Sequence, residues 1–113
     1  MSKYRSDNPT PEQIAALQGP VVLEFGTDWC GHCQAAQRWV DTALAAHSTV
    51  HHLRAEDGKG RRLGRAFGVK LWPTLVFLHN GQEVARVVRP ARAEDLQDAL
   101  QSLIQKIHAG TEK

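Results

Sequence analysis

Both cysteines of the chain lie in one Cys-x-x-Cys motif, Cys30-Gly31-His32-Cys33, where a short apolar run ends and a helical pattern begins. A disulfide that staples a fold joins distant segments, because closing a long loop restricts the unfolded chain more. A bond between Cys30 and Cys33 would close only a small ring, so a hydrophobic core must hold this fold together. The motif therefore indicates a dithiol that opens and closes in redox chemistry.

A chain of 113 residues, 42% of them hydrophobic, can bury one core, so we expect a single domain over 1–113, with 1–9 as a loose N-terminal segment. No apolar stretch approaches the ~20 residues of a membrane span, and the polar start lacks the apolar segment of a signal peptide. A net charge of +2 is too small to indicate a nucleic-acid partner. We therefore expect a cytoplasmic monomer, although a leader removed beforehand would leave no trace. In that compartment a Cys-x-x-Cys is usually redox-active or binds a metal.

Helical and strand patterns alternate along most of the chain. Thr10 and Gln13 can form a capping box around Pro11, which predicts a short helix that ends at Gly19-Pro20. The run 21–25 is apolar except at Glu24, which is typical of a strand covered on both faces. The rest of the pattern predicts a helix over 30–47, strands over 50–54, 74–78 and 84–88, a short helix over 61–67 and an Asn80-Gly81 turn. It also predicts a last helix with Glu94 and Asp95 in its first turn and Gly110 after its end, which carries the apolar stripe Leu96, Leu100, Leu103, Ile104 and Ile107.

The order of elements after the first helix is therefore β-α-β-α-β-β-α. A helix between the first two strands favours a parallel pair with a right-handed crossover, whereas the short turn between the last two strands requires an antiparallel pair. The pattern predicts an α/β fold with a central mixed sheet of about four strands and helices on both faces.

Five short segments spread over most of the chain resemble the thioredoxin family: Phe25, Trp29-Cys30-Gly31-His32-Cys33, Phe67-Gly68-Val69, Trp72-Pro73-Thr74 and Asn80-Gly81. The resemblance implies a thioredoxin fold and a thiol-disulfide oxidoreductase that needs no cofactor beyond its own cysteine pair. It also implies that Pro73 is a cis-proline facing the dithiol. A cis bond there would expose the backbone of Trp72 to an extended substrate, which could pair with it as an added strand.

Some positions differ from thioredoxin itself. His32 between the cysteines, and Trp72 before the proline, are more similar to modules of protein disulfide isomerase. Thioredoxin has aspartate at the position of Glu24, tryptophan at Gly26, proline at Arg38 and glycine near Arg89. Arg89 falls on the surface where family members receive substrates, so these departures bear on the choice of partner rather than on the basic chemistry.

The two cysteines have different expected roles. Cys30 lies at a helix N-terminus, where free N–H groups and the helix dipole favour the thiolate, which is the attacking species. Cys33 lies one turn into the helix and should stay protonated until it resolves the mixed disulfide. An imidazolium at His32 would stabilise the thiolate and make the couple more oxidising, whereas Asp28 opposes that effect. The alternative is that His32 is a solvated loop residue without a role in the chemistry.

Glu24 is the one carboxylate in the apolar run. If its strand is central, burial would raise the pKa of the carboxyl and make Glu24 a proton acceptor for Cys33 through a water molecule, as the family's buried acid suggests. The alternative is a structural residue at the end of the sheet that is solvated or paired with Arg54. We expect the substrate-binding surface to consist of Trp29, Gly31, Trp72, Thr74 and Arg89.

These features favour an enzyme that acts on protein disulfides and is reset by a reductase or a small thiol. A second reading is a redox-silent binding module on the same scaffold, for which Arg89 and the missing tryptophan at Gly26 are the arguments. A third is a metal-binding module, but Cys30 and Cys33 supply only two of the four ligands of a usual structural zinc site, and His32 is badly placed to join them.

Overall fold

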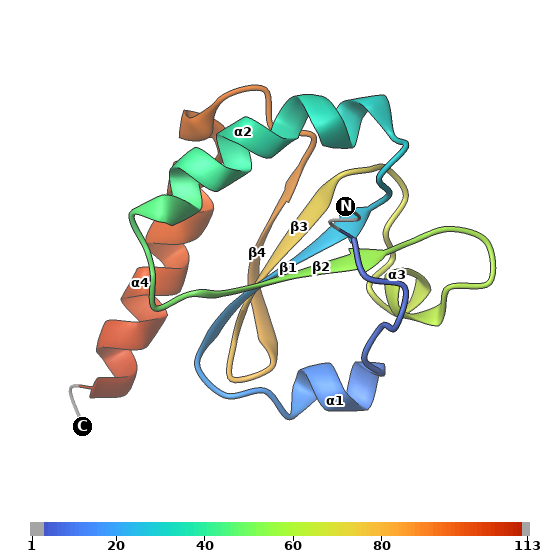
Figure 1. Cartoon of the computed structure of the whole chain (residues 1–113). Helices are drawn as coiled ribbons and strands as arrows, with labels where there is room; N and C mark the ends of the chain where they lie inside the picture. Colours follow the sequence, from blue (N-terminus) through green and yellow to red (C-terminus); the bar gives the residue numbers. More distant parts are fainter. Residues whose placement is uncertain (1–3, 112–113) are drawn as a thin grey trace.

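The elements follow the predicted order in the computed structural model, which describes residues 4–111 (Figure 1). They are α1 Pro11–Ala15, β1 Pro20–Gly26, α2 Gly31–Ala45, β2 His51–Glu56, α3 Arg62–Ala66, β3 Thr74–His79, β4 Gln82–Val88, the 3-10 helix η1 Ala93–Leu96, and α4 Gln97–Thr111. The last helix differs from expectation, because Glu94 and Asp95 lie in η1 and α4 continues through Gly110. Within residues 4–111, no helix has both the length and the hydropathy needed to cross a bilayer.

The four strands form one mixed sheet in the order β2-β1-β3-β4, which confirms the predicted α/β fold class. β1 pairs in parallel with β2 and antiparallel with β3, and β3 pairs antiparallel with β4. The turn between the last two strands has positive φ at both central residues, 52° at Asn80 and 80° at Gly81, which is the geometry that an Asn-Gly hairpin favours. β1 is thus an inner strand, and every residue from Val21 to Gly26 in it is buried.

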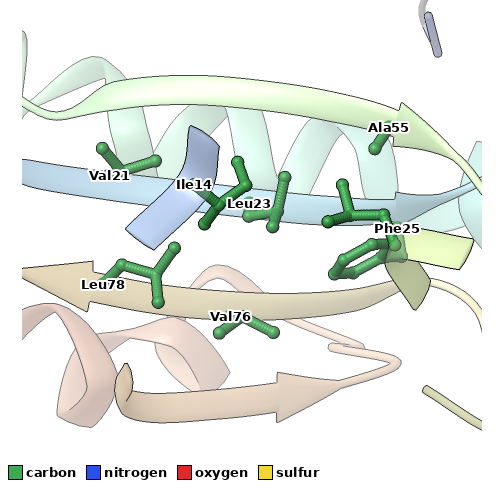
Figure 2. Close-up of a cluster of buried hydrophobic side chains, with 8 residues drawn as sticks. Ile14, Val21, Leu23, Phe25, Ala55, Val76 and Leu78 are labelled. Carbon is green, nitrogen blue, oxygen red and sulfur yellow. The ribbon is translucent and has the colours of Figure 1, made fainter. Parts of the chain in front are cut away.

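Alternation along β1 sends its side chains to opposite faces of the sheet, and each face has its own core. Val21, Leu23 and Phe25 pack under α1 and α3 with Ile14 and Leu63, as Figure 2 shows for part of this cluster. The opposite face packs against α2 and α4, with the core Val22, Val40, Leu75, Phe77, Leu96, Ala99, Leu100 and Leu103. Glu24 shares its direction with Val22, so the carboxylate faces the α2 side of the sheet.

The expectation of a loose N-terminal segment is wrong from residue 4 onward; residues 1–3 lie outside the described part of the chain. Arg5 forms a parallel bridge with Ala55 at the free edge of β2. Its N–H donates to the Arg54 carbonyl at 3.1 Å, and its carbonyl accepts from the Glu56 N–H at 2.9 Å. Tyr4 is only 3% exposed and packs with Cys30 and Cys33 in a small third cluster. The segment therefore reaches the dithiol.

Candidate active site

The dithiol lies at the N-terminus of α2, just after the loop that follows β1. Cys30 is the N-cap residue of α2, with extended backbone, and its Sγ accepts a hydrogen bond from the Cys33 N–H at 3.3 Å. This hydrogen bond and the helix dipole both favour negative charge on Cys30 Sγ. Both cysteines are free thiols; Cys30 is 7% exposed and Cys33 only 1%. Both cysteines are thus buried, and Cys33 is the deeper of the two.

Cys33 is held in its protonated form. Burial, and after it the hydrogen bond with Cys30, raise the pKa of the Cys33 thiol from its ordinary value of 9.0 to about 12. A thiol with so high a pKa carries almost no thiolate at neutral pH, and the thiolate is the reactive species. Cys33 is therefore a poor nucleophile as long as the pKa of its thiol stays high.

Pro73 immediately precedes β3, which begins at Thr74. The Trp72–Pro73 peptide bond is cis, as the resemblance implied, and Pro73 is buried. Thr74 is 1% exposed, and its hydroxyl donates to the Leu71 carbonyl at 2.6 Å. The Thr74 side chain thus supports the loop that carries Pro73. In this structure the side chain is turned away from solvent, and substrate contact by Thr74 stays a prediction.

Apolar side chains form a rim beside the dithiol. Trp29 is 74% exposed and meets the edge of Trp72 at a centroid distance of 5.7 Å. Trp72 is half-buried, and its indole N–H donates to Asp57 Oδ2 at 2.8 Å, which fixes the ring. Leu71 and Val88 are the other large hydrophobic side chains exposed within residues 4–111. Gly31 and His32 are exposed on the first turn of α2, so a bound chain can reach both residues.

Arg89 contacts the backbone that precedes the cis-proline. Its Nε donates to the Trp72 carbonyl at 2.8 Å, and its backbone N–H donates to the Pro73 carbonyl at 3.0 Å. Arg89 has a φ of 52°, in the left-handed region that favours glycine, and glycine is what thioredoxin has near this position. The side chain is exposed, so the guanidinium covers the Trp72 carbonyl from the solvent side.

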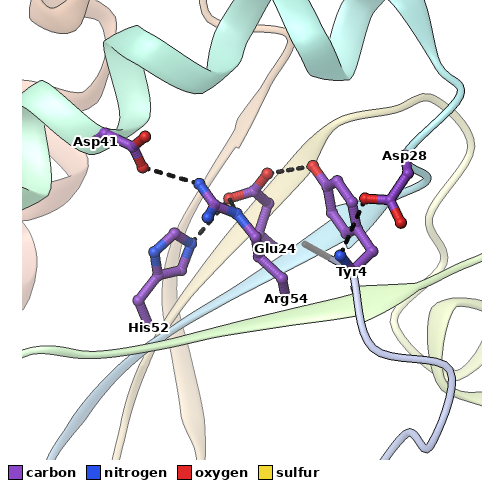
Figure 3. Close-up of polar contacts among 6 residues, drawn as sticks. All are labelled: Tyr4, Glu24, Asp28, Asp41, His52 and Arg54. Carbon is purple, nitrogen blue, oxygen red and sulfur yellow. Dashed lines mark hydrogen bonds and ion pairs between the residues drawn. The ribbon is translucent and has the colours of Figure 1, made fainter. Parts of the chain in front are cut away.

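Glu24 is 1% exposed and is fully partnered within the protein (Figure 3). Its Oε1 lies 2.8 Å from His52 Nε2 and 3.1 Å from Arg54 Nε, and its Oε2 accepts a hydrogen bond from the Tyr4 hydroxyl. Burial acts to raise the pKa of this carboxyl. The hydrogen bond with His52, the charge of Arg54 and the hydrogen bond of Tyr4 together outweigh burial and hold the pKa below its ordinary value.

The expectation of a raised pKa at Glu24 is therefore wrong, and its pairing with Arg54 is present. A carboxylate with a lowered pKa stays charged at neutral pH and is a poor resting proton acceptor. Arg54 is itself anchored by Asp41 on α2, at 2.9 Å. Glu24 is the centre of an ionic cluster that joins β1, β2, α2 and the N-terminal segment.

Sequence reasoning missed three members of this cluster, Tyr4, Asp41 and His52. His52 could have been found from strand alternation, because it lies two residues before Arg54 and so shares its face. Tyr4 could have been sought from Gly26, where thioredoxin has tryptophan, since a missing aromatic side chain leaves space for another. A Cβ on Gly26 would lie only 2.8 Å from the Tyr4 hydroxyl oxygen and 2.6 Å from Cys33 Sγ.

The metal-binding interpretation requires a group of ligand side chains around the two cysteines. Among residues 4–111, no group of three or more His, Cys, Asp and Glu side chains is placed to hold an ion. Cys30 and Cys33 would remain two ligands, whereas a structural zinc site takes four.

Comparison with known proteins agrees with the geometry. The family model for thioredoxin matches residues 4–102. The structure of reduced thioredoxin 2 from Pseudomonas aeruginosa PAO1 superposes with a TM-score of 0.82 at 53% identity, covering 91% of this chain and 95% of that one. Thioredoxin Asp f 28 from Aspergillus fumigatus is 27% identical over 97 residues, which are 86% of this chain and 90% of that protein.

A human relative, protein disulfide-isomerase A2, is 45% identical over 73 residues. That match covers 60% of this chain but only 14% of the relative, so this chain corresponds to one part of a much longer protein. The extent of the family match, together with a Cys-x-x-Cys at a helix N-terminus that packs against the tryptophan of a cis Trp72–Pro73 bond, leads to one conclusion. The chain belongs to the thioredoxin family of thiol-disulfide oxidoreductases.

Proposed function

We propose that this protein exchanges disulfides in extended protein segments through a mixed disulfide at Cys30 that Cys33 resolves. Members of the family act on protein disulfides and depend on reductase partners. The observation that carries the proposal is the inequality of the two sulfurs: Cys30 lies at the helix end beside the exposed Trp29, while Cys33 is 1% exposed with a pKa of about 12.

The reaction has two steps. In the first, the Cys30 thiolate attacks one sulfur of a substrate disulfide, so that a Cys30–substrate bond forms and the substrate S–S bond breaks. The other substrate sulfur leaves as a thiolate and takes a proton from water. In the second, Cys33 loses its proton to solvent and attacks Cys30 Sγ; the Cys30–Cys33 bond forms and the second substrate thiolate leaves. Two electrons pass from the dithiol to the substrate, and a reductase or small thiol returns them, so no further cofactor is required.

The surface around Cys30 fits an extended chain. The tryptophan rim offers apolar area to the side chains of a substrate, and the backbone of Trp72 can pair with its main chain as in strand addition. Arg89 now donates to the Trp72 carbonyl that such a strand would use. A substrate must therefore displace the guanidinium or accept it as an added contact. Arg89 thereby makes the site selective among extended chains.

The test is to trap the first step. Cys33→Ser should accumulate a covalent adduct with a peptide disulfide, visible as the added peptide mass, whereas Cys30→Ser should form none. Wild type should reduce insulin with dithiothreitol as electron donor, and Cys30→Ser should not. A wild-type protein that is inactive, together with a Cys33→Ser variant that traps no adduct, would reject the proposal and leave the redox-silent binding module.

A further inference from the structure

Tyr4 brings a phenol to the buried side of the dithiol. It is the only tyrosine of the chain, and it comes from the N-terminal segment, 20 residues before the carboxylate that it contacts. Its hydroxyl donates to Glu24 Oε2, and Figure 3 shows the ring pointing toward that carboxylate. The Tyr4 backbone N–H donates to Asp28 Oδ1 at 3.2 Å. These two contacts hold the residue at its backbone and at the hydroxyl end of its side chain.

The hydroxyl also faces Cys33. The point where a Gly26 Cβ would stand is 2.8 Å from Tyr4 Oη and 2.6 Å from Cys33 Sγ, so both atoms border the space that Gly26 leaves open. Tyr4 packs against Cys33, and its hydroxyl acts to lower the pKa of the Cys33 thiol, although burial more than offsets this effect. Gly26, which lacks a side chain where thioredoxin has a tryptophan, is what allows this contact.

A phenol has one proton and here has two acceptors. While Cys33 is a thiol, the charged carboxylate of Glu24 is the better acceptor, and the proton points there. Once Cys33 is a thiolate, its sulfur competes for the same proton. Glu24 can release it, because Arg54 and His52 both remain on Oε1 and continue to balance the charge of the carboxylate. The phenol itself stays protonated, since burial and the charge of Glu24 both raise the pKa of Tyr4.

We propose that Tyr4 turns its hydroxyl from Glu24 to Cys33 as the resolving thiolate forms, and that this hydrogen bond speeds the resolution step. The Cys33 proton passes to solvent, the Tyr4 proton stays on its own oxygen, and only its acceptor changes. Glu24 acts as a positioning residue that holds Tyr4 ready, in place of the water-linked base that the sequence suggested. This inference rests on the proposed two-step function and assigns its second step.

Several charged or titratable groups surround the resolving sulfur. Cys33 faces Cys30 on its own helix, the backbone of Thr27 after β1, and Tyr4 from the N-terminal segment. Behind Tyr4 lies the cluster on the other elements: Glu24, His52, Arg54 and Asp41. Of these side chains, Tyr4 is the one that contacts both Glu24 and Cys33, so removing its hydroxyl separates the cluster from the sulfur.

The test uses a chromogenic aromatic disulfide, dithiobis(nitrobenzoate), in stopped flow. Attack by Cys30 releases the first nitrothiophenolate and resolution by Cys33 releases the second, so the two steps are read separately. Tyr4→Phe keeps the ring and its burial but loses the hydroxyl. We expect it to slow the second phase about tenfold between pH 7 and 9, the usual scale for one hydrogen bond to a charged group, and to leave the first phase unchanged. The rate–pH profile of Tyr4→Phe should keep the shape of the wild-type profile and be displaced to higher pH.

Glu24→Gln distinguishes a positioning role of Glu24 from a role as the base. A neutral amide is a weaker competitor for the phenol proton, so this variant should resolve at least as fast as wild type. If Glu24 were instead the base, the second phase would slow in Glu24→Gln while Tyr4→Phe retained its rate. That pair of results, or a second phase of wild-type rate in Tyr4→Phe alone, overturns the proposal and leaves the two-step function intact. A first phase absent from wild type would instead reject the function.

A spectroscopic measurement covers the case in which Tyr4→Phe does not fold. Because the chain has one tyrosine, incorporation of 3-fluorotyrosine labels position 4 alone. The fluorine resonance of the reduced protein should move with pH as Cys33 titrates, and this movement should vanish in Cys33→Ser. A resonance that moves identically in both proteins would show that the phenol does not respond to the sulfur, and would overturn the proposal.

Discussion

Replacing Gly26 with alanine tests how tightly the dithiol is packed from behind. The added methyl would stand 2.6 Å from Cys33 Sγ and 2.8 Å from both the Tyr4 ring and its hydroxyl. Ordinary contacts between such atoms are ~3.5–4.0 Å, so the methyl overlaps two neighbours by roughly an ångström. Neither neighbour can easily give way, because Tyr4 is bound to Glu24 and Asp28, and Cys33 lies in the first turn of α2. Overpacking of a fixed site costs about 1–3 kcal/mol, and we expect the upper part of that range.

The assay is urea unfolding under reducing conditions, followed by circular dichroism. Gly31→Ala is the matched control, because a Cβ at Gly31 meets nothing within 4 Å and a helix favours alanine over glycine. We expect Gly26→Ala to lose about 2–3 kcal/mol and Gly31→Ala to lose none. In a Tyr4→Ala background, the Gly26→Ala change should cost clearly less, because one of its two clashes is gone. Equal stabilities for Gly26→Ala and Gly31→Ala would refute the reasoning.

Three further predictions concern the chemistry and the charge cluster. His32→Pro should lower the reduction potential, by about 30 mV if the imidazolium contributes ~1.4 kcal/mol, as measured by equilibration with glutathione; an unchanged potential removes His32 from that role. Arg89→Ala should lower the KM for a peptide disulfide about threefold by freeing the Trp72 carbonyl, and a raised KM would show that Arg89 holds substrates. Folding lowers the pKa of Glu24 below its ordinary value of 4.5. The ionised carboxylate therefore adds to the free energy of unfolding above pH 4.5, and this contribution is lost as the pH falls. The stability gap between wild type and Glu24→Gln should narrow below that pH in urea unfolding, and a gap that widens there would contradict the pairing.

Local pattern was enough to predict the elements and their order. Periodicity and caps act within a few residues, so the helix at Cys30 and the Asn80-Gly81 turn follow from short segments. The burial of Glu24 also follows from pattern, because apolar neighbours on both sides indicate an inner strand. Its pKa does not, since that depends on which groups cross from β2 and the N-terminal segment to meet it.

Tyr4 shows why the remainder of the site was not predicted. A polar segment with one aromatic residue is typical of a loosely held chain terminus. The contact that orders this segment is long-range, because Arg5 pairs with Ala55 on β2, 50 residues away. Thr74 shows the converse case. Its place in a family motif indicated substrate contact, whereas the backbone turns its side chain inward to Leu71.

The bridge between Arg5 and Ala55 also sets how long Tyr4 stays in place. Two backbone hydrogen bonds at the edge of β2 are a small cooperative unit, and such units open far more often than a whole domain unfolds. One such excursion would leave the sheet and both cysteines undisturbed while carrying the phenol away from them. The reactivity of the deeper sulfur is then linked to a local opening equilibrium, which substitutions at the chain's beginning could tune without touching the dithiol.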